Sequence, residues 1–367
     1  MINVCVFLGY TVATNIDGWN QKYKEGIIND SMPYGYDNAS SEEINVDYIR
    51  LNKFEKKILF NRYFQYGYLY LIKLPILLFK YDVVWTHYDK DSLYIAKLRR
   101  IPTINKFMAK QVANFVWLID KSKGYSAKKN KRISKVLSRI DKIIYLASTE
   151  TQKFIDIFNV NPARLQFVHF GINFDAYSSN EPSTKPKDID GNEENFILSV
   201  GTDMHRDIDL LDDLASLMKD KNFILCSRNE EYLNKRYKSS NLKVVCANLS
   251  EMRYLYNNCS CVIIPLKYNE HASGCTTLIE AAAMKKPFII SDIPGIRDYV
   301  TENETGIITP IGDAEKFKEA VLKVTSDEQY AKTLVENAYN YMKDRFTTKK
   351  WAQEHVKITK EILGRNK

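Results

Sequence analysis

Residues 261–310 read "CVIIPLKYNEHASGCTTLIEAAAMKKPFIISDIPGIRDYVTENETGIITP", and this stretch decides the fold. It opens with an apolar, β-branched run that ends at Pro265, which is typical of a buried strand. A loop of polar and small residues follows, and an alanine-rich segment beginning near Cys275 or Thr276 predicts a helix. The apolar run "PFIISD" predicts the next strand. Strands that alternate with helices in this way indicate a parallel sheet covered by helices.

The junction between this loop and the predicted helix has the features of an anion site. Ser273 and Gly274 precede the helix. The unpaired N–H groups of the first helical turn and the positive end of the helix dipole point at the same spot, where phosphate is the expected ligand. Glu280 follows in the helix, where its carboxylate can accept hydrogen bonds from paired hydroxyls such as those of a ribose. The alternative is a structural glutamate that interacts with the dipole.

The same alternation of short apolar runs with helical patterns extends over the whole chain. The runs are INVCVFL, YDVVWTH, KIIYLAS, LQFVHFG, FILSVG, NFILCS, LKVVCA, CVIIPL, PFIISD and GIITP. They predict an α/β protein built from two Rossmann-like, doubly wound parallel-sheet domains, since 367 residues exceed the usual size of one core.

The series of runs is interrupted once, at residues 178–195, which contain two prolines and many turn formers. We therefore predict an N-terminal domain over 1–177, a linker over 178–195 and a C-terminal domain over 196–345. Residues 346–367 have an amphipathic helical pattern, and we expect this helix to return across the domain seam.

Cysteine and histidine placement argues against a metal centre. The six cysteines form no CxxC pair and mostly lie in apolar runs, as core residues of a protein in a reducing compartment do. The five histidines are scattered, and none is paired with a cysteine at ligand spacing, so we expect no bound metal and no cofactor. Met1 leads directly into a strand-like run, so we expect no signal peptide and a cytoplasmic location.

Positive charge is concentrated in the N-terminal half. Residues 51–142 contain 21 Lys or Arg against 6 Asp or Glu, whereas the net charge of the whole chain is +8. Aromatic residues interleave with lysines over residues 56–80. The longest apolar stretch, residues 66–79, is interrupted by Lys73 and Pro75 and is too short to span a bilayer. This pattern suits an interfacial helix on the inner face of an anionic membrane, or a buried helix with lysines at its edge. No nucleic-acid-binding module is present in the sequence, so we expect no nucleic-acid partner.

The sequence "SGCTTLIEAAAMKKPFIISDIPGIRDYVTENETGIITPIGDAEKF", from Ser273 to Phe317, closely resembles the nucleotide-sugar-binding signature of family-4-like glycosyltransferases. This resemblance implies the GT-B fold, in which two Rossmann-like domains face each other across a cleft. It implies that Glu280 binds the ribose hydroxyls of a nucleotide. The residues that would cradle the diphosphate are Gly274, Cys275, Thr276 and Thr277, and Ser273 and Gly201 are further candidates for binding the nucleotide sugar.

One position departs from the family pattern. The family commonly carries another glutamate eight positions before the ribose-binding one, and that position is Ala272 in this chain. The missing carboxylate is the one that the resemblance associates with the donor sugar. Glu270 stands two residues earlier and could substitute through a changed loop path, or the role could be absent.

A second stretch of the resemblance, "FILSVGTDMHRDIDLLDDLA", runs from residue 196 to 215. Its strand ends at Gly201, and its helix is predicted to begin near Asp207 or Asp209. Arg206 resembles the basic residue that stabilises the leaving diphosphate, a role that suits a guanidinium. Thr202 stands where many members have a second arginine, so Lys267 could supply that charge. The alternatives are a surface ion pair for Arg206 and an exposed loop position for Lys267.

In the N-terminal half, the run "YDVVWTHYDKD" places His87 just after a predicted strand, at the edge where ligands bind in open α/β sheets. It is similar to the active-site histidine of the family, although a lone histidine at a strand end is often structural. Asp89 and Asp91 could suggest a cation site of the other glycosyltransferase fold. A cation is not needed at this position, because the resemblance assigns stabilisation of the leaving diphosphate to basic groups of the C-terminal half.

The expected activity is transfer of a sugar from a nucleoside diphosphate sugar to a hydroxyl of a glycan or lipid-linked acceptor, without a metal. The resemblance implies retention of anomeric configuration and suggests bacterial surface-polysaccharide or glycolipid assembly. A sugar-nucleotide epimerase of the same fold and a non-catalytic scaffold remain alternatives.

Overall fold

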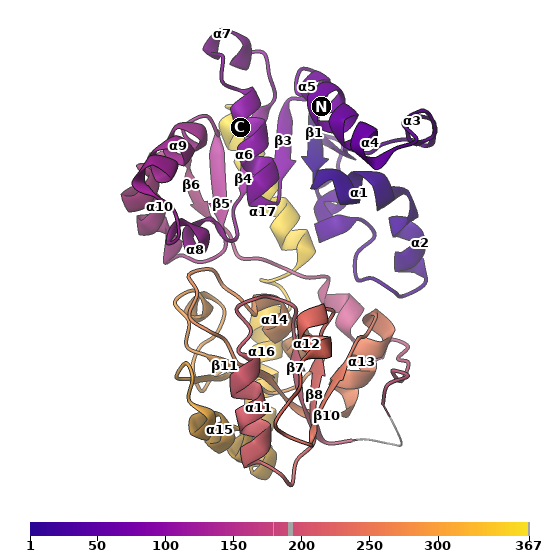
Figure 1. The fold of residues 1–367 in the computed structure, drawn as a ribbon, viewed down its shortest axis with the longest axis vertical. Coiled ribbons are helices and arrows are strands. Elements are labelled where there is room, and N and C mark those ends of the chain that lie inside the picture. The colour runs from indigo at the N-terminus through magenta and orange to yellow at the C-terminus, as the bar shows by residue number, and fades with distance from the viewer. Residues whose placement is uncertain (179, 190–193, 366–367) are drawn as a thin grey trace. The chain divides into compact units, whose positions relative to one another are not determined.

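The computed structural model describes residues 1–178, 180–189 and 194–365 (Figure 1). Contacts divide the chain into two compact units. Unit 1 comprises residues 1–22, 31–168 and 348–367, and unit 2 comprises residues 23–30 and 169–347. Each unit contains one six-stranded sheet in which all pairs of strands are parallel. The predicted α/β class with two Rossmann-like sheets is confirmed.

The sheet of unit 1 has the strand order β2-β1-β3-β4-β5-β6. Its strands are β1 (Ile2–Phe7), β2 (Ile44–Tyr48), β3 (Val83–Thr86), β4 (Lys110–Asn114), β5 (Lys142–Tyr145) and β6 (Leu165–Phe167). The strand order reverses between β1 and β3, which pair directly. Ligands of open α/β sheets bind beyond the carboxyl ends of the strands at such a reversal. Gly9 and His87 follow these two strands.

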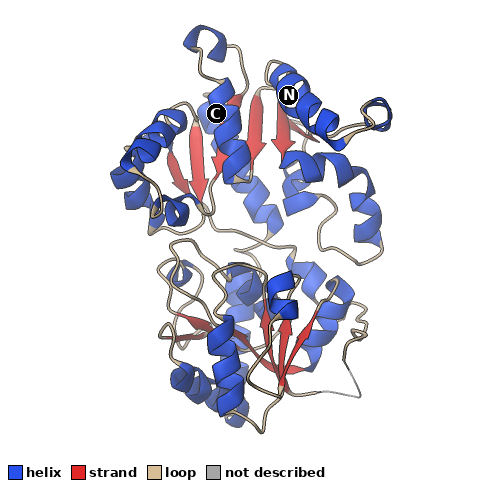
Figure 2. Ribbon diagram, viewed as in Figure 1, coloured by secondary structure: helices blue, strands red, loops and turns tan. Residues whose placement is uncertain are grey.

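Helices lie on both faces of this sheet (Figure 2). The helices of unit 1 are α1 (Gly9–Asn15), α2 (Trp19–Lys24, whose last two residues belong to unit 2), α3 (Lys53–Ile58), α4 (Arg62–Tyr68), α5 (Leu74–Leu77), α6 (Asp89–Leu98), α7 (Pro102–Asn105), α8 (Leu118–Ser122), α9 (Ala127–Leu137), α10 (Glu150–Phe158) and α17 (Thr348–Ile362). A π-helical turn, η3 (Leu69–Lys73), joins α4 to α5, and 3₁₀ turns include η2 (Pro33–Ala39). The strands β3 and β5 are buried along their whole length, as strands covered on both faces must be.

The sheet of unit 2 has the order β9-β8-β7-β10-β11-β12. Its strands are β7 (Phe196–Val200), β8 (Phe223–Cys226), β9 (Leu242–Val245), β10 (Cys259–Ile264), β11 (Phe288–Ser291) and β12 (Ile307–Thr309). Counted within the unit, this is the 3-2-1-4-5-6 order of a Rossmann fold. The reversal lies between β7 and β10, so a ligand site is expected at their carboxyl ends.

The helices of unit 2 are α11 (Ile208–Leu217), α12 (Glu230–Asn234), α13 (Leu249–Asn258), α14 (Cys275–Ala283), α15 (Ala314–Ser326) and α16 (Glu328–Met342). Shorter 3₁₀ turns are η5 (Phe174–Tyr177) and η6 (Ile296–Asp298). Two predicted helix starts are confirmed. The helix α14 begins at Cys275, and α11 begins after the N-cap Asp207, whose side chain accepts a hydrogen bond from the Leu210 N–H at 3.1 Å.

The division into units differs from the boundaries expected from the sequence. Unit 1 ends at residue 168 rather than 177 because the following segment packs within unit 2, where the Phe170 N–H donates to the Tyr299 hydroxyl at 2.9 Å. Residues 23–30 also belong to unit 2. Of the predicted linker, residues 179 and 190–193 lie outside the described residues.

The C-terminal helix α17 belongs to unit 1. Its Thr359 hydroxyl accepts a hydrogen bond from the buried Trp85 indole at 2.9 Å, and Glu361 forms a 2.7 Å ion pair with Lys142. Trp351, Ala352 and Ile358 are buried, in agreement with the amphipathic pattern. Among the described residues, the helices are all too short or too polar to cross a membrane.

Candidate nucleotide-binding site

A pocket of about 300 Å³ lies at the carboxyl edge of the unit 2 sheet. Its walls come from the residues that follow β7, β8 and β9 and from the start of α14. Gly201, Arg206, Gly274, Thr277 and Glu280 all line it. The pocket thus occupies the position at which the strand order reverses, where a Rossmann sheet binds its ligand.

The Arg206 guanidinium is almost completely buried, with 5% of the residue exposed. Its Nη2 donates to the Thr277 hydroxyl at 2.8 Å, and that hydroxyl donates in turn to the Val200 carbonyl at 3.3 Å. Its Nε and Nη1 atoms have no hydrogen-bond partner among the described residues. Burial lowers the pKa of Arg206, but a guanidinium stays charged at neutral pH. A buried, charged group with unused donors suits an anion as its partner.

Two glycines make room for this guanidinium. Gly201 has φ +153°, and a Cβ atom at this position would lie 2.1 Å from Arg206 Nε. Gly274 has φ +84°, and a Cβ there would lie 2.8 Å from Ile264 Cγ2 and 3.4 Å from Arg206 Nη1. A side chain at position 201 would therefore collide with the guanidinium, whereas at position 274 the positive φ and the contact with Ile264 favour glycine.

Gly274 is also the N-cap of α14. Its left-handed conformation turns the chain from the loop into the helix, so Thr276 and Thr277 in the first turn line the pocket. The N–H groups of a first turn have no carbonyl partner in their own helix, and the helix dipole adds partial positive charge. The helix N-terminus and Arg206 therefore provide donors for one anion.

Glu280 lies further along α14 and lines the same pocket. Its Oε2 accepts from the Tyr256 hydroxyl at 2.7 Å, and its Oε1 accepts from the Tyr177 hydroxyl at 2.9 Å. Burial raises the pKa of this carboxyl above its usual value, although the two tyrosine hydroxyls and Arg206 act in the opposite direction. Since each carboxylate oxygen can accept more than one hydrogen bond, the two tyrosines orient Glu280 without exhausting it.

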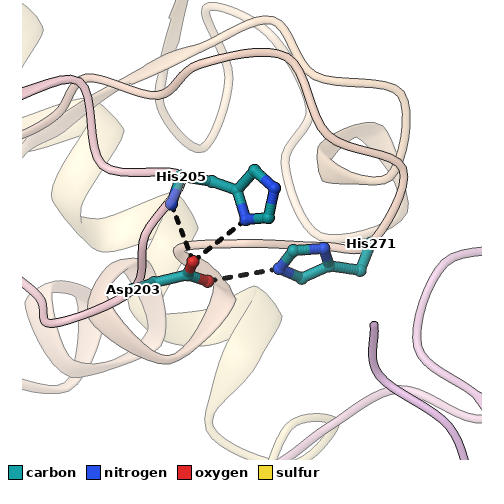
Figure 3. A group of neighbouring side chains, drawn as sticks. All are labelled: Asp203, His205 and His271. Atoms are coloured by element: carbon teal, nitrogen blue, oxygen red, sulfur yellow. Dashed lines mark hydrogen bonds and ion pairs between the residues drawn. The ribbon is translucent and has the colours of Figure 1, made fainter. Parts of the chain in front are cut away.

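Asp203, His205 and His271 form a cluster (Figure 3), and the Arg206 N–H donates to the Asp203 carbonyl at 3.0 Å. Asp203 Oδ1 pairs with His205 Nδ1 at 3.1 Å, and Oδ2 pairs with His271 Nε2 at 3.2 Å. The Ser273 hydroxyl also donates to Oδ2 at 3.0 Å. Burial alone would raise the pKa of Asp203, but the hydrogen bonds from both histidines hold it well below its usual range. The cluster therefore ties the loop after β7 to the loop before α14.

The ligand atoms of this cluster lie within 4.8 Å of one another, as in sets that can hold a metal ion. The spacing of the histidines in the sequence did not predict this group, because Asp203 precedes His271 by 68 residues. Each histidine here pairs with a different oxygen of Asp203, as expected for an ion-pair network. The expectation of no bound metal remains a prediction.

Other predicted residues lie around the pocket without lining it. The Ser273 side chain is turned toward Asp203, and Cys275 is buried. Glu270 is buried and accepts from the Tyr268 hydroxyl at 3.1 Å, while Ala272 is also buried. Lys267 is half exposed, and its amine lies 3.9 Å from Asp209. The roles assigned to these residues from the sequence stay predictions.

His87 belongs to unit 1 and follows β3 directly. It is buried, its Nδ1 lies 2.9 Å from the Tyr36 hydroxyl, and its ring stacks on Tyr34 with centroids 3.7 Å apart. Asn114 Nδ2 lies 3.0 Å from the same hydroxyl and 3.2 Å from His355 Nε2. Burial and the nearby His355 lower the pKa of His87 to about 3, so its imidazole is neutral at pH 7.

Several residues that line the pocket or support its side chains were not anticipated. Tyr177 and Tyr256 hold Glu280, and Asp203 holds the two loops, but each acts through partners far away in the chain. Arg228 could have been found, because it follows β8 at the carboxyl edge where ligands bind. Its Nη2 donates to the Ala247 carbonyl at 2.9 Å.

Residues 184–341 match the family described as glycosyl transferases group 1. The match covers 158 of the 367 residues, which is less than half of the chain. The matched segment contains Arg206, Gly274 and Glu280, and it includes the whole signature from Ser273 to Phe317 on which the resemblance was based.

Two curated relatives match shorter segments. The capsular polysaccharide biosynthesis glycosyltransferase CapM of Staphylococcus aureus is 28% identical over 106 residues, which are 29% of this chain and 27% of CapM. The uncharacterized glycosyltransferase MJ1069 of Methanocaldococcus jannaschii is 26% identical over 89 residues, which are 24% of this chain and 23% of that protein. The matched segments thus span about a quarter of these relatives.

Solved structures resemble the chain over almost its whole length. HepE of Anabaena in complex with UDP-glucose superimposes with a TM-score of 0.68 at 14% identity, covering 99% of both chains. The sucrose-phosphate synthase of Thermosynechococcus elongatus gives a TM-score of 0.71 at 14% identity, covering 99% of this chain and 100% of the synthase. Together with the two parallel sheets, these likenesses establish the GT-B fold.

Proposed function

We propose that this protein is a glycosyltransferase that moves a sugar from a nucleoside diphosphate sugar to a hydroxyl acceptor. The observation that carries the proposal is the buried Arg206 guanidinium, whose Nε and Nη1 have no partner among the described residues and which lines a pocket at the N-terminus of α14. Burying charged donors without hydrogen-bond partners costs free energy, and a bound diphosphate would lower this cost by accepting hydrogen bonds from them.

In this reaction the bond between the anomeric carbon and the diphosphate oxygen breaks, and negative charge grows on the leaving phosphate. Arg206 and the N-terminus of α14 would stabilise this charge. Glu280, oriented by Tyr177 and Tyr256, would accept hydrogen bonds from the ribose hydroxyls. A pocket of about 300 Å³ lies at the lower end of the usual range for ligand sites.

We further propose that the reaction retains anomeric configuration. The acceptor oxygen would bond to the anomeric carbon, and the acceptor proton would pass to the leaving phosphate. In an inverting reaction a protein base would take this proton instead. His87 is neutral at pH 7 and could accept a proton, but its low pKa makes it a weak base.

For the donor and acceptor, we propose a UDP-hexose and a glycan or lipid-linked hydroxyl in polysaccharide or glycolipid assembly. The name of CapM includes capsular polysaccharide biosynthesis, and HepE was solved with UDP-glucose. A cytoplasmic location is consistent with the cysteines, because Cys5, Cys226, Cys259, Cys261 and Cys275 are buried free thiols.

The proposal also includes independence of metal ions, because Arg206 and a helix N-terminus supply the positive charge that a cation supplies elsewhere. Transfer should therefore persist in the presence of a chelator. Loss of transfer with EDTA and its recovery with Mg²⁺ or Mn²⁺ would contradict this part of the proposal. Recovery with Zn²⁺ alone would direct attention to the cluster around Asp203.

The primary test is thermal stabilisation of the protein by UDP and by a panel of nucleotide sugars, followed by product analysis with and without a sugar acceptor. Stabilisation by UDP-sugars together with acceptor-dependent release of UDP is the expected result. Conversion of the nucleotide sugar without any acceptor would indicate an epimerase. The absence of stabilisation by every nucleotide would refute both enzymatic functions and favour a scaffold.

A further inference from the structure

The helical segment formed by α4, η3 and α5 is apolar on two opposite sides. On the inner side, Leu69, Tyr70 and Leu74, followed by Leu78, are buried in a core cluster of unit 1. On the outer side, the residues Phe64, Leu71, Ile72, Ile76 and Phe79 are between 51% and 72% exposed. We call these five residues the outer apolar face.

No charged residue interrupts the outer apolar face. From Leu71 to Phe79, successive members are four residues apart or fewer, and Pro75, which lies between them, is uncharged. The lysine of this segment, Lys73, is turned toward Glu55 and forms a 2.6 Å ion pair with it. A helix on a protein surface normally presents polar residues to water, so a continuous apolar outer face indicates a partner.

Neighbouring segments extend this surface. Phe60 and Tyr63, at the start of α4, are 82% and 85% exposed. The Ala109 N–H donates to the Leu78 carbonyl, so the chain that follows α7, residues 106–109, lies next to Phe79. Phe107 in that segment is 68% exposed. Aromatic residues therefore project from two adjacent parts of unit 1.

Exposed cations accompany the apolar residues. They include Lys53, Lys57, Arg62, Lys80, Arg100 and Lys106, and none of them has a carboxylate partner among the residues that the structure describes. The one acidic residue between positions 51 and 80 is Glu55, which Lys73 neutralises. The surface around the outer apolar face is thus positively charged.

We propose that the outer apolar face and its surrounding cations bind the surface of an anionic lipid bilayer. Projecting aromatic and aliphatic side chains can enter the boundary between headgroups and acyl chains, while Lys and Arg contact anionic headgroups. A bilayer accepts this combination without a matching shape, whereas a protein partner would need an apolar groove with an acidic rim. The membrane proposal is separate from the transfer reaction, because the outer apolar face lies in unit 1 and the candidate pocket lies in unit 2.

Co-sedimentation with vesicles tests this proposal. The full chain should bind vesicles of phosphatidylcholine and phosphatidylglycerol, and bind less to phosphatidylcholine alone or at high salt. The double variant Ile72→Ser/Ile76→Ser should lose affinity for these vesicles by about tenfold or more, because it removes apolar burial at two positions. Lys57→Glu/Arg62→Glu should lose the preference for anionic vesicles.

The matched control is Leu217→Ser/Leu322→Ser, which changes two aliphatic residues of unit 2 that are 43% and 44% exposed. It should bind vesicles as the unchanged protein does. The proposal is overturned if the unchanged protein stays in the supernatant, or if the control loses as much binding as Ile72→Ser/Ile76→Ser. A dimer in size-exclusion chromatography that this variant dissociates, without vesicle binding, would instead identify a protein interface. Stabilisation by UDP, measured on the same samples, reports separately on the proposed function.

Discussion

Arg206 and Thr277 are joined by a 2.8 Å hydrogen bond between guanidinium Nη2 and the threonine hydroxyl. The hydroxyl proton is used by the Val200 carbonyl, so the threonine oxygen acts as an acceptor for Arg206. This contact holds the guanidinium at one end, while Nε and Nη1 have no hydrogen-bond partner among the described residues, and Arg206 lines the pocket. The arrangement is therefore preorganised for an anion and does not require the arginine to be ordered when the ligand binds.

Replacing Arg206 should impair catalysis more than stability. Arg206→Ala removes the charge that stabilises the leaving diphosphate, and we expect kcat/KM for the donor to fall by about 100-fold or more, as for other preorganised donors. Steady-state kinetics of UDP release measure this change. Arg297→Ala is the control, because Arg297 is half exposed and pairs with Asp292 on the surface. Equal losses in both variants would contradict the role of Arg206.

The space that Gly201 leaves for Arg206 should be essential for UDP binding. In Gly201→Ala the new Cβ would lie 2.1 Å from Arg206 Nε, so the guanidinium must move and UDP affinity should be lost. Gly312→Ala is matched to it, since Gly312 also has a positive φ of +76° but has open space around its Cβ position. That variant should lose only about 1 kcal/mol of stability from backbone strain. Calorimetric titration with UDP distinguishes the two, and full affinity in Gly201→Ala would refute the close approach.

Glu280 should recognise the ribose rather than the phosphates. We expect Glu280→Gln, which has one acceptor oxygen in place of two, to weaken UDP binding by about tenfold and to leave inorganic pyrophosphate binding unchanged. Tyr256→Phe should have a smaller effect in the same direction, because it removes one of the two hydrogen bonds that orient the carboxylate, the one at 2.7 Å. A parallel loss of pyrophosphate affinity would show that Glu280 acts by shaping the whole pocket.

The stability of unit 1 should fall in acid. Burial lowers the pKa of His87 to about 3 and that of His355 to about 4. Between these values and the ordinary pKa near 6.5, the unfolded chain binds protons that the folded chain does not, so the free energy of unfolding decreases as the pH falls through this range. The expected slope is about 1.4 kcal/mol per pH unit for each histidine.

Tryptophan fluorescence during urea unfolding measures this effect on unit 1 alone, because the four tryptophans, at positions 19, 85, 117 and 351, all belong to it. His87→Gln should reduce the slope between pH 4 and 6. If the slope of this variant equals that of the unchanged protein, His87 is not the group that titrates.

Local pattern was sufficient for most of the fold. Apolar runs predicted every strand except β2 and β4. The strand β2 is a half-buried edge strand, and β4 begins with Lys110 and Gln111 although it is central in its sheet. Gln111 can be buried there because its side chain donates to the Ser92 carbonyl at 2.9 Å. That contact depends on packing, so it leaves no trace in the hydrophobic pattern.

The residues of the candidate site also fall into two groups, those that the sequence predicted and those that it did not. Gly201, Arg206, Gly274 and Glu280 were predicted from their positions at strand ends and at a helix start, and the structure brings all four into one pocket. The partners of these residues were not predictable. Tyr177 precedes Glu280 by 103 residues, and Asp203 precedes Ser273 by 70, so no local spacing connects them.

By itself, the sequence determined the alternation of strands and helices and therefore the two parallel sheets, because apolar periodicity and turn residues act over a few neighbouring positions. Parallel strands bring their carboxyl ends to one edge, which is why the approximate place of the site also followed. Only the tertiary structure decided that Arg206 keeps free donors, that Asp203 joins His205 to His271, that α17 belongs to unit 1, and that one side of α4 and α5 stays uncovered. Those features arise from packing between segments far apart in the chain, where burial and side-chain direction are set by the whole unit.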